Sequence, residues 1–168
     1  MKIGFILECG PKGPDLHVCK YLATRILEEA NLKPDFSFTT LDNKPNLLQQ
    51  CGDAASLHLS QGCERVLIVW DLYPAWRERG QKPCRHEDRQ PIFAALEAAH
   101  VDRNHVALIC IQEELEAWLL ADGDALTAFL RKFNSHVTKV SHNKNPERIG
   151  FNPKTALNDR MQEQTGQK

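Results

Sequence analysis

The sequence predicts an α/β protein whose core is a mainly parallel sheet of about four strands flanked by helices. Three runs of apolar, largely β-branched residues have the length and composition of buried strands, and each run ends in an acidic residue. Between them lie segments with apolar residues at three- and four-residue spacing, which is typical of amphipathic helices. Strands that alternate with helices in this way form parallel sheets with right-handed crossovers, so we expect a Rossmann-like domain.

The expected elements follow one another from the N-terminus. The three runs that end in acid are 2–8, 66–71 and 106–114. A fourth strand at 36–41 alternates polar and apolar residues, which suits either an edge strand or a strand that is half exposed. The segment 72–91 lacks an apolar period, and a loop of that length is usually functional or mobile. Helices are expected at 15–30, 46–61, 91–100, 114–122 and 153–163.

Composition narrows the class of protein. Of 168 residues, 42% are hydrophobic and 26% charged, which is ordinary for a globular protein. No stretch approaches the roughly twenty apolar residues of a membrane span, and the short apolar start before Glu8 is a first strand rather than a secretory signal. We therefore expect a cytoplasmic protein without membrane contact, whose six cysteines are reduced structural thiols.

Charge is distributed unevenly along the chain. Lys and Arg outnumber Asp and Glu in residues 131–168, whereas residues 1–130 carry the acidic surplus. We expect residues 1–130 to form the α/β domain and residues 131–168 a basic, loop-rich extension with a short helix. We expect the basic extension to contact phosphate groups and the acidic residues 1–130 to attract cations.

Acidic residues at the strand ends are the main candidates for a site. Parallel strands present their carboxyl ends at one edge of the sheet, so Glu8 and Asp71 should meet there with one or two of Glu113, Glu114 and Glu116. Such carboxylates are ligands for Mg²⁺ or Mn²⁺, and two metals would activate water and stabilise the leaving oxygen in phosphodiester cleavage. The alternative is that each of these acids has no ligand-binding role. Acidic residues are common at strand ends, which are exposed to solvent, and they are favourable at helix N-termini.

The acids after the last strand differ in orientation. On one helix, Glu114 and Glu116 would point about 200° apart, so both reach one metal only if the helix begins after or between them. We expect Glu114 to be the inward ligand. Glu116 is a further metal-ligand candidate and is otherwise a partner for a basic side chain.

Basic residues in the long loop and the tail are candidates for binding a nucleic-acid backbone, with Tyr73 and Trp76 placed to stack on a base. The alternative is a solvated surface of mixed charge. Neither a Walker-type loop nor a dinucleotide fingerprint occurs, so those routes to nucleotide binding are not predicted. The candidate backbone-binding residues are Arg77, Arg79, Lys82, Arg85 and Lys154.

Three motifs resemble the TOPRIM domain, the α/β catalytic module of topoisomerases, primases and related nucleases. Ile6-Leu7-Glu8-Cys9-Gly10 looks like its first motif, and Ile68-Val69-Trp70-Asp71-Leu72-Tyr73 looks like its Asp-x-Asp motif. The segment from Gln112 to Asp122, with Asn152-Pro153-Lys154 downstream, is similar to a small bacterial TOPRIM-like family. The resemblance implies a Mg²⁺ site, and it implies an ABC- or SMC-type ATPase partner in a phage-defence setting.

The resemblance has one departure, because Tyr73 stands where the second Asp would be. Either Glu87 or Asp88 compensates, or metal affinity is weak, or catalysis has been lost. The first hypothesis is a Mg²⁺-dependent nuclease acting on DNA or RNA, with Glu8, Asp71 and Glu114 as catalytic metal ligands.

The competing hypothesis is a non-catalytic partner or sensor subunit that docks on an ATPase. A small phosphatase on a related sheet is the third. The metal count, a homo-oligomeric state and the choice of substrate stay open at this stage.

Overall fold

The structure is a computed structural model that describes residues 1–33, 35–72, 84–112, 115–141 and 153–166. It divides into two compact units, Met1–Cys110 and Ile111–Lys168. The first contains nearly the whole sheet, and the second is helical. This division by compactness falls before residue 130, and the expected domain boundary at that residue stays a prediction.

The first unit is built on a four-stranded parallel sheet with strand order β2-β1-β3-β4. This confirms the predicted α/β class, and the alternating strand lies at an edge of the sheet, which is one of the two positions expected for it. Leu7 at the end of β1 lies opposite Thr40 of β2 and Val69 of β3, so these strands end at the same edge. The strands are β1 (Lys2–Leu7), β2 (Asp35–Thr40), β3 (Arg65–Asp71) and β4 (Val106–Ile111).

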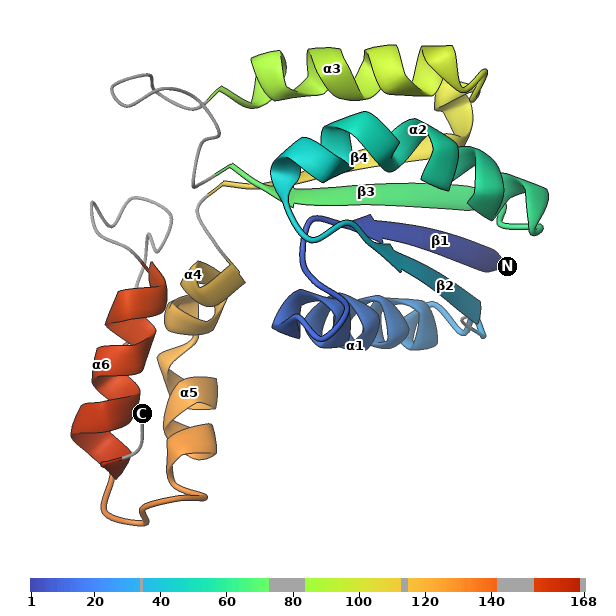
Figure 1. Cartoon of the computed structure of the whole chain (residues 1–168). Coiled ribbons are helices and arrows are strands. Elements are labelled where there is room, and N and C mark those ends of the chain that lie inside the picture. Colours follow the sequence, from blue (N-terminus) through green and yellow to red (C-terminus); the bar gives the residue numbers. More distant parts are fainter. Residues whose placement is uncertain (34, 73–83, 113–114, 142–152, 167–168) are drawn as a thin grey trace. The chain divides into compact units, whose positions relative to one another are not determined.

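Helices cover both faces of the sheet, with α2 and α3 on one face and α1 on the other (Figure 1). The main core lies under α2 and α3, where Ile68, Trp70 and Leu96 are at most 1% exposed. In contrast, α1 packs mainly along β2 and buries no residue fully, and Ile26, expected on its inner face, is exposed. The helices are α1 (Pro14–Glu29), α2 (Lys44–Ser60) and α3 (Arg85–Ala98), and a short 3-10 turn, η1 (Arg103–His105), precedes β4.

The start of α3 corrects the sequence prediction. We expected a loop up to Pro91 and a helix from that proline, but α3 begins at Arg85 and contains Pro91 in its interior. A proline inside a helix removes one backbone hydrogen bond. Here Ile92 and Leu96 are fully buried against α2 and β3, and this tertiary packing holds the helix through the proline.

In its described residues, the second unit contains three helices around a separate small core. The helix expected at 114–122 ends at Ala121, just before Asp122. A second helix that the sequence did not predict begins at once, because Asp122 is its N-cap: the side chain accepts a hydrogen bond of 2.9 Å from Ala125 N. None of the helices in the described part of the chain is long and apolar enough to cross a membrane. The three are α4 (Leu115–Ala121), α5 (Gly123–Leu130) and α6 (Pro153–Thr165).

A buried histidine, His58 on α2, lies against the first strand. It is 2% exposed, and Gly4 makes room for it, because a Cβ at Gly4 would lie 2.7 Å from the ring. His58 Nε2 and Thr39 Oγ1 share a hydrogen bond of 3.0 Å, and Nδ1 lies 4.0 Å from the Cys63 thiol. Burial lowers the pKa of His58, so the folded protein holds the neutral ring.

We therefore expect the contribution of His58 to the free energy of unfolding to fall as pH drops below the ordinary histidine pKa of about 6.5. The unfolded chain binds this proton more readily than the folded chain, so protonation favours unfolding. His58→Gln should flatten the dependence between pH 6.5 and 5, measured by urea unfolding. His17→Gln, at an exposed position of α1, is the control and should retain the wild-type slope. An unchanged slope in His58→Gln would show that other groups cause it.

Candidate functional site

The neighbouring strands β1 and β3 mark the point where the strand order reverses. From β1 the chain continues to β2 on one side, and it then returns to β3 on the other side. In open α/β sheets, ligands bind in the crevice outside the carboxyl ends of the strands at such a point. Glu8 directly follows β1 and Asp71 ends β3, so both predicted acids lie at the carboxyl ends of these two strands.

Backbone geometry holds Glu8 and Asp71 next to each other. Glu8 N donates to Val69 O at 3.2 Å, which extends the pairing of the two strands beyond β1. Asp71 N then donates to Glu8 Oε2 at 3.1 Å. The structure thus brings together the two acids that the strand pattern placed at one edge, while their roles as metal ligands stay predictions.

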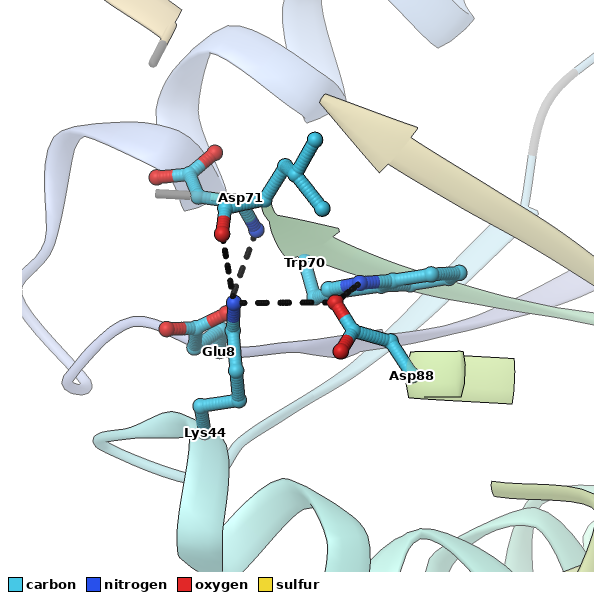
Figure 2. Close-up of polar contacts among 6 residues, drawn as sticks. Glu8, Lys44, Trp70, Asp71 and Asp88 are labelled. Atoms are coloured by element: carbon cyan, nitrogen blue, oxygen red, sulfur yellow. Dashed lines mark hydrogen bonds and ion pairs between the residues drawn. The ribbon is translucent and has the colours of Figure 1, made fainter. Parts of the chain in front are cut away.

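A lysine and an aspartate from two helices complete this cluster (Figure 2). Lys44, the first residue of α2, donates from Nζ to Leu72 O at 3.1 Å and lies 4.0 Å from Asp88 Oδ2. Trp70 Nε1 donates to the same Asp88 oxygen at 3.4 Å. The side chains of Lys44 and Asp88 are 4% and 5% exposed. We call the set Glu8, Lys44, Trp70, Asp71 and Asp88 the rim cluster.

The environment of Glu8 favours its neutral form. Burial raises the pKa of Glu8 to about 7, and the negative charges of Asp15 and Asp88 act in the same direction. The Lys44 ammonium and the hydrogen bond from Asp71 N oppose this shift but do not cancel it. Glu8 is therefore close to half-protonated at neutral pH, and an added cation would favour its ionised form.

This shift predicts how stability depends on pH when no cation is added. Because the pKa is about 7 in the folded state and 4.5 ordinarily, the folded chain binds more protons between these values. The contribution of Glu8 to stability is therefore fully present below pH 4.5 and is lost as pH rises to 7. After allowance for solvent screening the loss is on the order of 1–2 kcal/mol.

The test compares urea unfolding of wild type and Glu8→Gln in EDTA across this pH range. The variant cannot ionise at this position, so its stability should gain on that of wild type as pH rises. Glu64→Gln, an exposed site just before β3, should run parallel to wild type. A constant difference between Glu8→Gln and wild type would contradict the raised pKa.

Acidic charge also reaches the α1 side of the edge. Burial raises the pKa of the Cys19 thiol on α1 to about 11, and the charges of Asp15 and Asp71 add to the effect. The Asp71 carboxylate points away from Lys44 (Figure 2). The backbone N–H of Asp71 is therefore directed toward Glu8, whereas the charge of its carboxylate acts toward α1.

Of the predicted basic residues, Arg85 lies near the rim. It is the first residue of α3 and is exposed. Burial raises the pKa of Cys110, near the end of β4, to about 11, and the charges of Asp88, Lys44 and Arg85 all act on this thiol. The charge of Arg85 thus reaches a thiol near the carboxyl end of β4.

The other predicted site residues are not joined to the rim cluster by the described structure. Glu114 lies outside the described residues, as do Glu113, Tyr73 and Trp76. Glu116 lies in the first turn of α4, half-buried, and Lys154 is exposed on α6; both belong to the second unit. Arg77, Arg79 and Lys82 also fall outside the described residues.

The donor atoms at the rim fit a hard divalent cation. Within the described ranges, no three side chains of His, Cys, Asp or Glu come together as a ready-made metal site. Mg²⁺, however, is commonly held by only one or two carboxylates, with waters and substrate phosphates as its other ligands. Glu8 and Asp71 supply that number. Asp88, expected as a substitute for the missing second Asp, is instead engaged by Trp70 and Lys44, and Glu87 is exposed.

Lys44 is the member of the cluster that sequence reasoning missed. A weak signal was present: Lys44 follows the N-cap Asn43, and a cation in the first turn opposes the helix dipole. Its burial and its partners depend on the crossovers that bring α2 and α3 to the same edge.

Comparison with known proteins identifies one family. The sequence profile of the domain of unknown function DUF4276 matches residues 17–168, which is most of the chain. No curated protein and no solved structure matches the chain significantly.

Proposed function

We propose that this chain, which belongs to the DUF4276 family, is a Mg²⁺- or Mn²⁺-dependent phosphodiesterase of TOPRIM type that cleaves DNA or RNA. The observation that carries the proposal is the pairing of Glu8 and Asp71 at the reversal of strand order, where Asp71 N donates to Glu8 Oε2 at 3.1 Å. An acidic pair at that edge of the sheet suits a divalent cation better than an anionic ligand.

In this proposal Glu8 and Asp71 hold the cation, and Glu114 is the third ligand. When bound, Mg²⁺ lowers the pKa of water and stabilises charge on phosphate oxygens. The hydrogen bond from Asp71 N fixes the orientation of the Glu8 carboxylate. Arg85 is exposed near the edge and is suited to a phosphate of the substrate backbone. Lys154 and the loop residues Arg77, Arg79 and Lys82 extend this binding role.

The proposal is tested by incubating the purified protein with supercoiled plasmid, single-stranded DNA and RNA, each with Mg²⁺, Mn²⁺, Ca²⁺ or EDTA. We expect cleavage with Mg²⁺ or Mn²⁺ and none with EDTA. A small phosphodiester such as bis-p-nitrophenyl phosphate separates a nuclease from a phosphodiesterase of small substrates. Absence of cleavage for all substrates, with no Mn²⁺ binding by calorimetry, would overturn the proposal.

A second candidate function is that of a partner subunit docking on an ABC- or SMC-type ATPase. The observation that favours it is an apolar groove of about 510 Å³ in the second unit, between α4, α5 and α6. Trp118, Leu119 and Phe129 line it and are 38%, 46% and 45% exposed. Co-expression with an ABC- or SMC-type ATPase from the same genome tests the candidate, because Leu119→Asp should abolish co-purification while the exposed Asp53→Ala should not.

A further inference from the structure

Lys44 occupies a position that is unfavourable for a lysine, because it is both at a helix N-terminus and buried. It is the first residue of α2, so its positive charge lies at the positive end of the helix dipole. It is also 3% exposed, and a buried ammonium is costly unless it is paired and hydrogen-bonded. The start of α2 does not need it, because Asn43 caps the helix by accepting from Asn46 N at 3.0 Å. The interactions that favour a lysine at position 44 must therefore come from residues outside the start of α2.

Those surroundings are the acids of the rim cluster. The ammonium donates to Leu72 O and lies 4.0 Å from Asp88 Oδ2, and it lowers the pKa of Glu8. In the view of Figure 2 the ammonium overlaps the Glu8 carboxylate and is joined by a dashed line to Asp88. One ammonium therefore serves two carboxylates that come from different elements of the fold.

A fixed ammonium at this position has a consequence for metal binding. A divalent cation between Glu8 and Asp88 would need the space that Lys44 Nζ fills, and it would be repelled strongly at such a short distance. The carboxylate of Asp71 points away from Lys44, so the Asp71 side of Glu8 is not subject to the same exclusion.

We propose that Lys44 is a built-in cation of the rim cluster, which takes the place of a second metal between Glu8 and Asp88 and limits the site to one divalent cation. The inference rests on the proposed metal-binding function and refines it from one or two metals to one. With 3% exposure Lys44 does not meet a polymer substrate, so it acts as a positioning residue that balances the charge of Glu8 and Asp88.

The test counts bound Mn²⁺ in the full chain by equilibrium dialysis and by electron paramagnetic resonance of free Mn²⁺. We expect one Mn²⁺ per chain in wild type and two in Lys44→Gln, because Gln keeps a donor for Leu72 O but removes the charge. The variant should also melt at about 5 °C lower temperature in EDTA and recover with Mn²⁺. A purely structural lysine would not be replaced by a metal ion. Lys20→Gln, on the exposed face of α1, is the matched control and should bind one Mn²⁺ with unchanged melting.

The outcomes separate the two proposals. Two Mn²⁺ in wild type, or one in Lys44→Gln without recovery by Mn²⁺, would overturn the role of Lys44 and leave the metal site standing. No Mn²⁺ in either protein would overturn both. If Lys44→Gln does not fold in EDTA, its folding on addition of Mn²⁺ supports the inference. If it does not fold with Mn²⁺ either, the number of Mn²⁺ ions bound per wild-type chain decides: one supports the inference and two overturn it.

Discussion

Asp71→Asn is expected to lower metal-dependent phosphodiester cleavage by about 100-fold or more. The substitution keeps the shape of the side chain and the backbone N–H that donates to Glu8 Oε2, but it removes the ligand charge. Loss of a few kcal/mol of charge stabilisation in the transition state corresponds to a factor of this size. The measurement is the rate of plasmid or RNA cleavage at saturating Mg²⁺, together with the dissociation constant for Mn²⁺.

Asp42→Asn is the matched control for this prediction. Asp42 is exposed after the edge strand β2, and its N donates to Cys9 O at 3.1 Å, so it shares the same edge of the sheet but not the reversal point. Asn tolerates its positive φ of 60°. We expect wild-type cleavage by Asp42→Asn and near-equal melting temperatures for all three proteins. Cleavage by Asp71→Asn at the wild-type rate would remove Asp71 from the site.

Gly52→Ala is expected to destabilise the fold by about 3 kcal/mol. Gly52 lies where α2 meets α3, and a Cβ at this position would overlap the carbonyl oxygen of Ala95 and lie 2.7 Å from its carbon. These are backbone atoms of another helix, so relief requires α3 to move away from the core residues Ile92 and Leu96. Urea unfolding at neutral pH measures the change.

The expected loss of stability in Gly52→Ala is opposite in sign to the effect that helix propensity alone would give. In an exposed helix interior, replacing Gly by Ala gains roughly 0.5–1 kcal/mol from helix propensity. Asp53→Ala, at the adjacent exposed position of α2, is the control and should change stability little. A Gly52→Ala protein as stable as wild type would mean that α2 and α3 do not approach as closely as described.

The sheet was predictable because its signals are local. Apolar β-branched runs identify the inner strands, and the alternating pattern at 36–41 is typical of an edge or half-exposed strand such as β2. The start of α3 was not predictable, because Pro91 reads locally as a helix start and only the packing of Ile92 and Leu96 overrides it. The helix α5 was missed for a similar reason, since an N-cap such as Asp122 and a simple break look alike in sequence.

The site was predictable in part, for a reason of topology. Glu8 and Asp71 follow strand ends, so the expectation of a parallel sheet was enough to place them together. Lys44 and Asp88 lie on helices, and their convergence on Glu8 depends on which face each crossover helix covers. A strand pattern does not encode that choice, and neither residue's burial can be read from its neighbours in sequence.

The central claim is that the edge formed by β1 and β3 binds a divalent cation through Glu8 and Asp71. Anomalous X-ray diffraction from crystals of the protein containing Mn²⁺ tests it most directly. We predict one anomalous peak within coordination distance of carboxylate oxygens of both Glu8 and Asp71, and none between Glu8 and Asp88 where Lys44 Nζ lies. Crystals in which Mn²⁺ binds only elsewhere, or in which Glu8 and Asp71 remain without metal at saturating Mn²⁺, would contradict the claim.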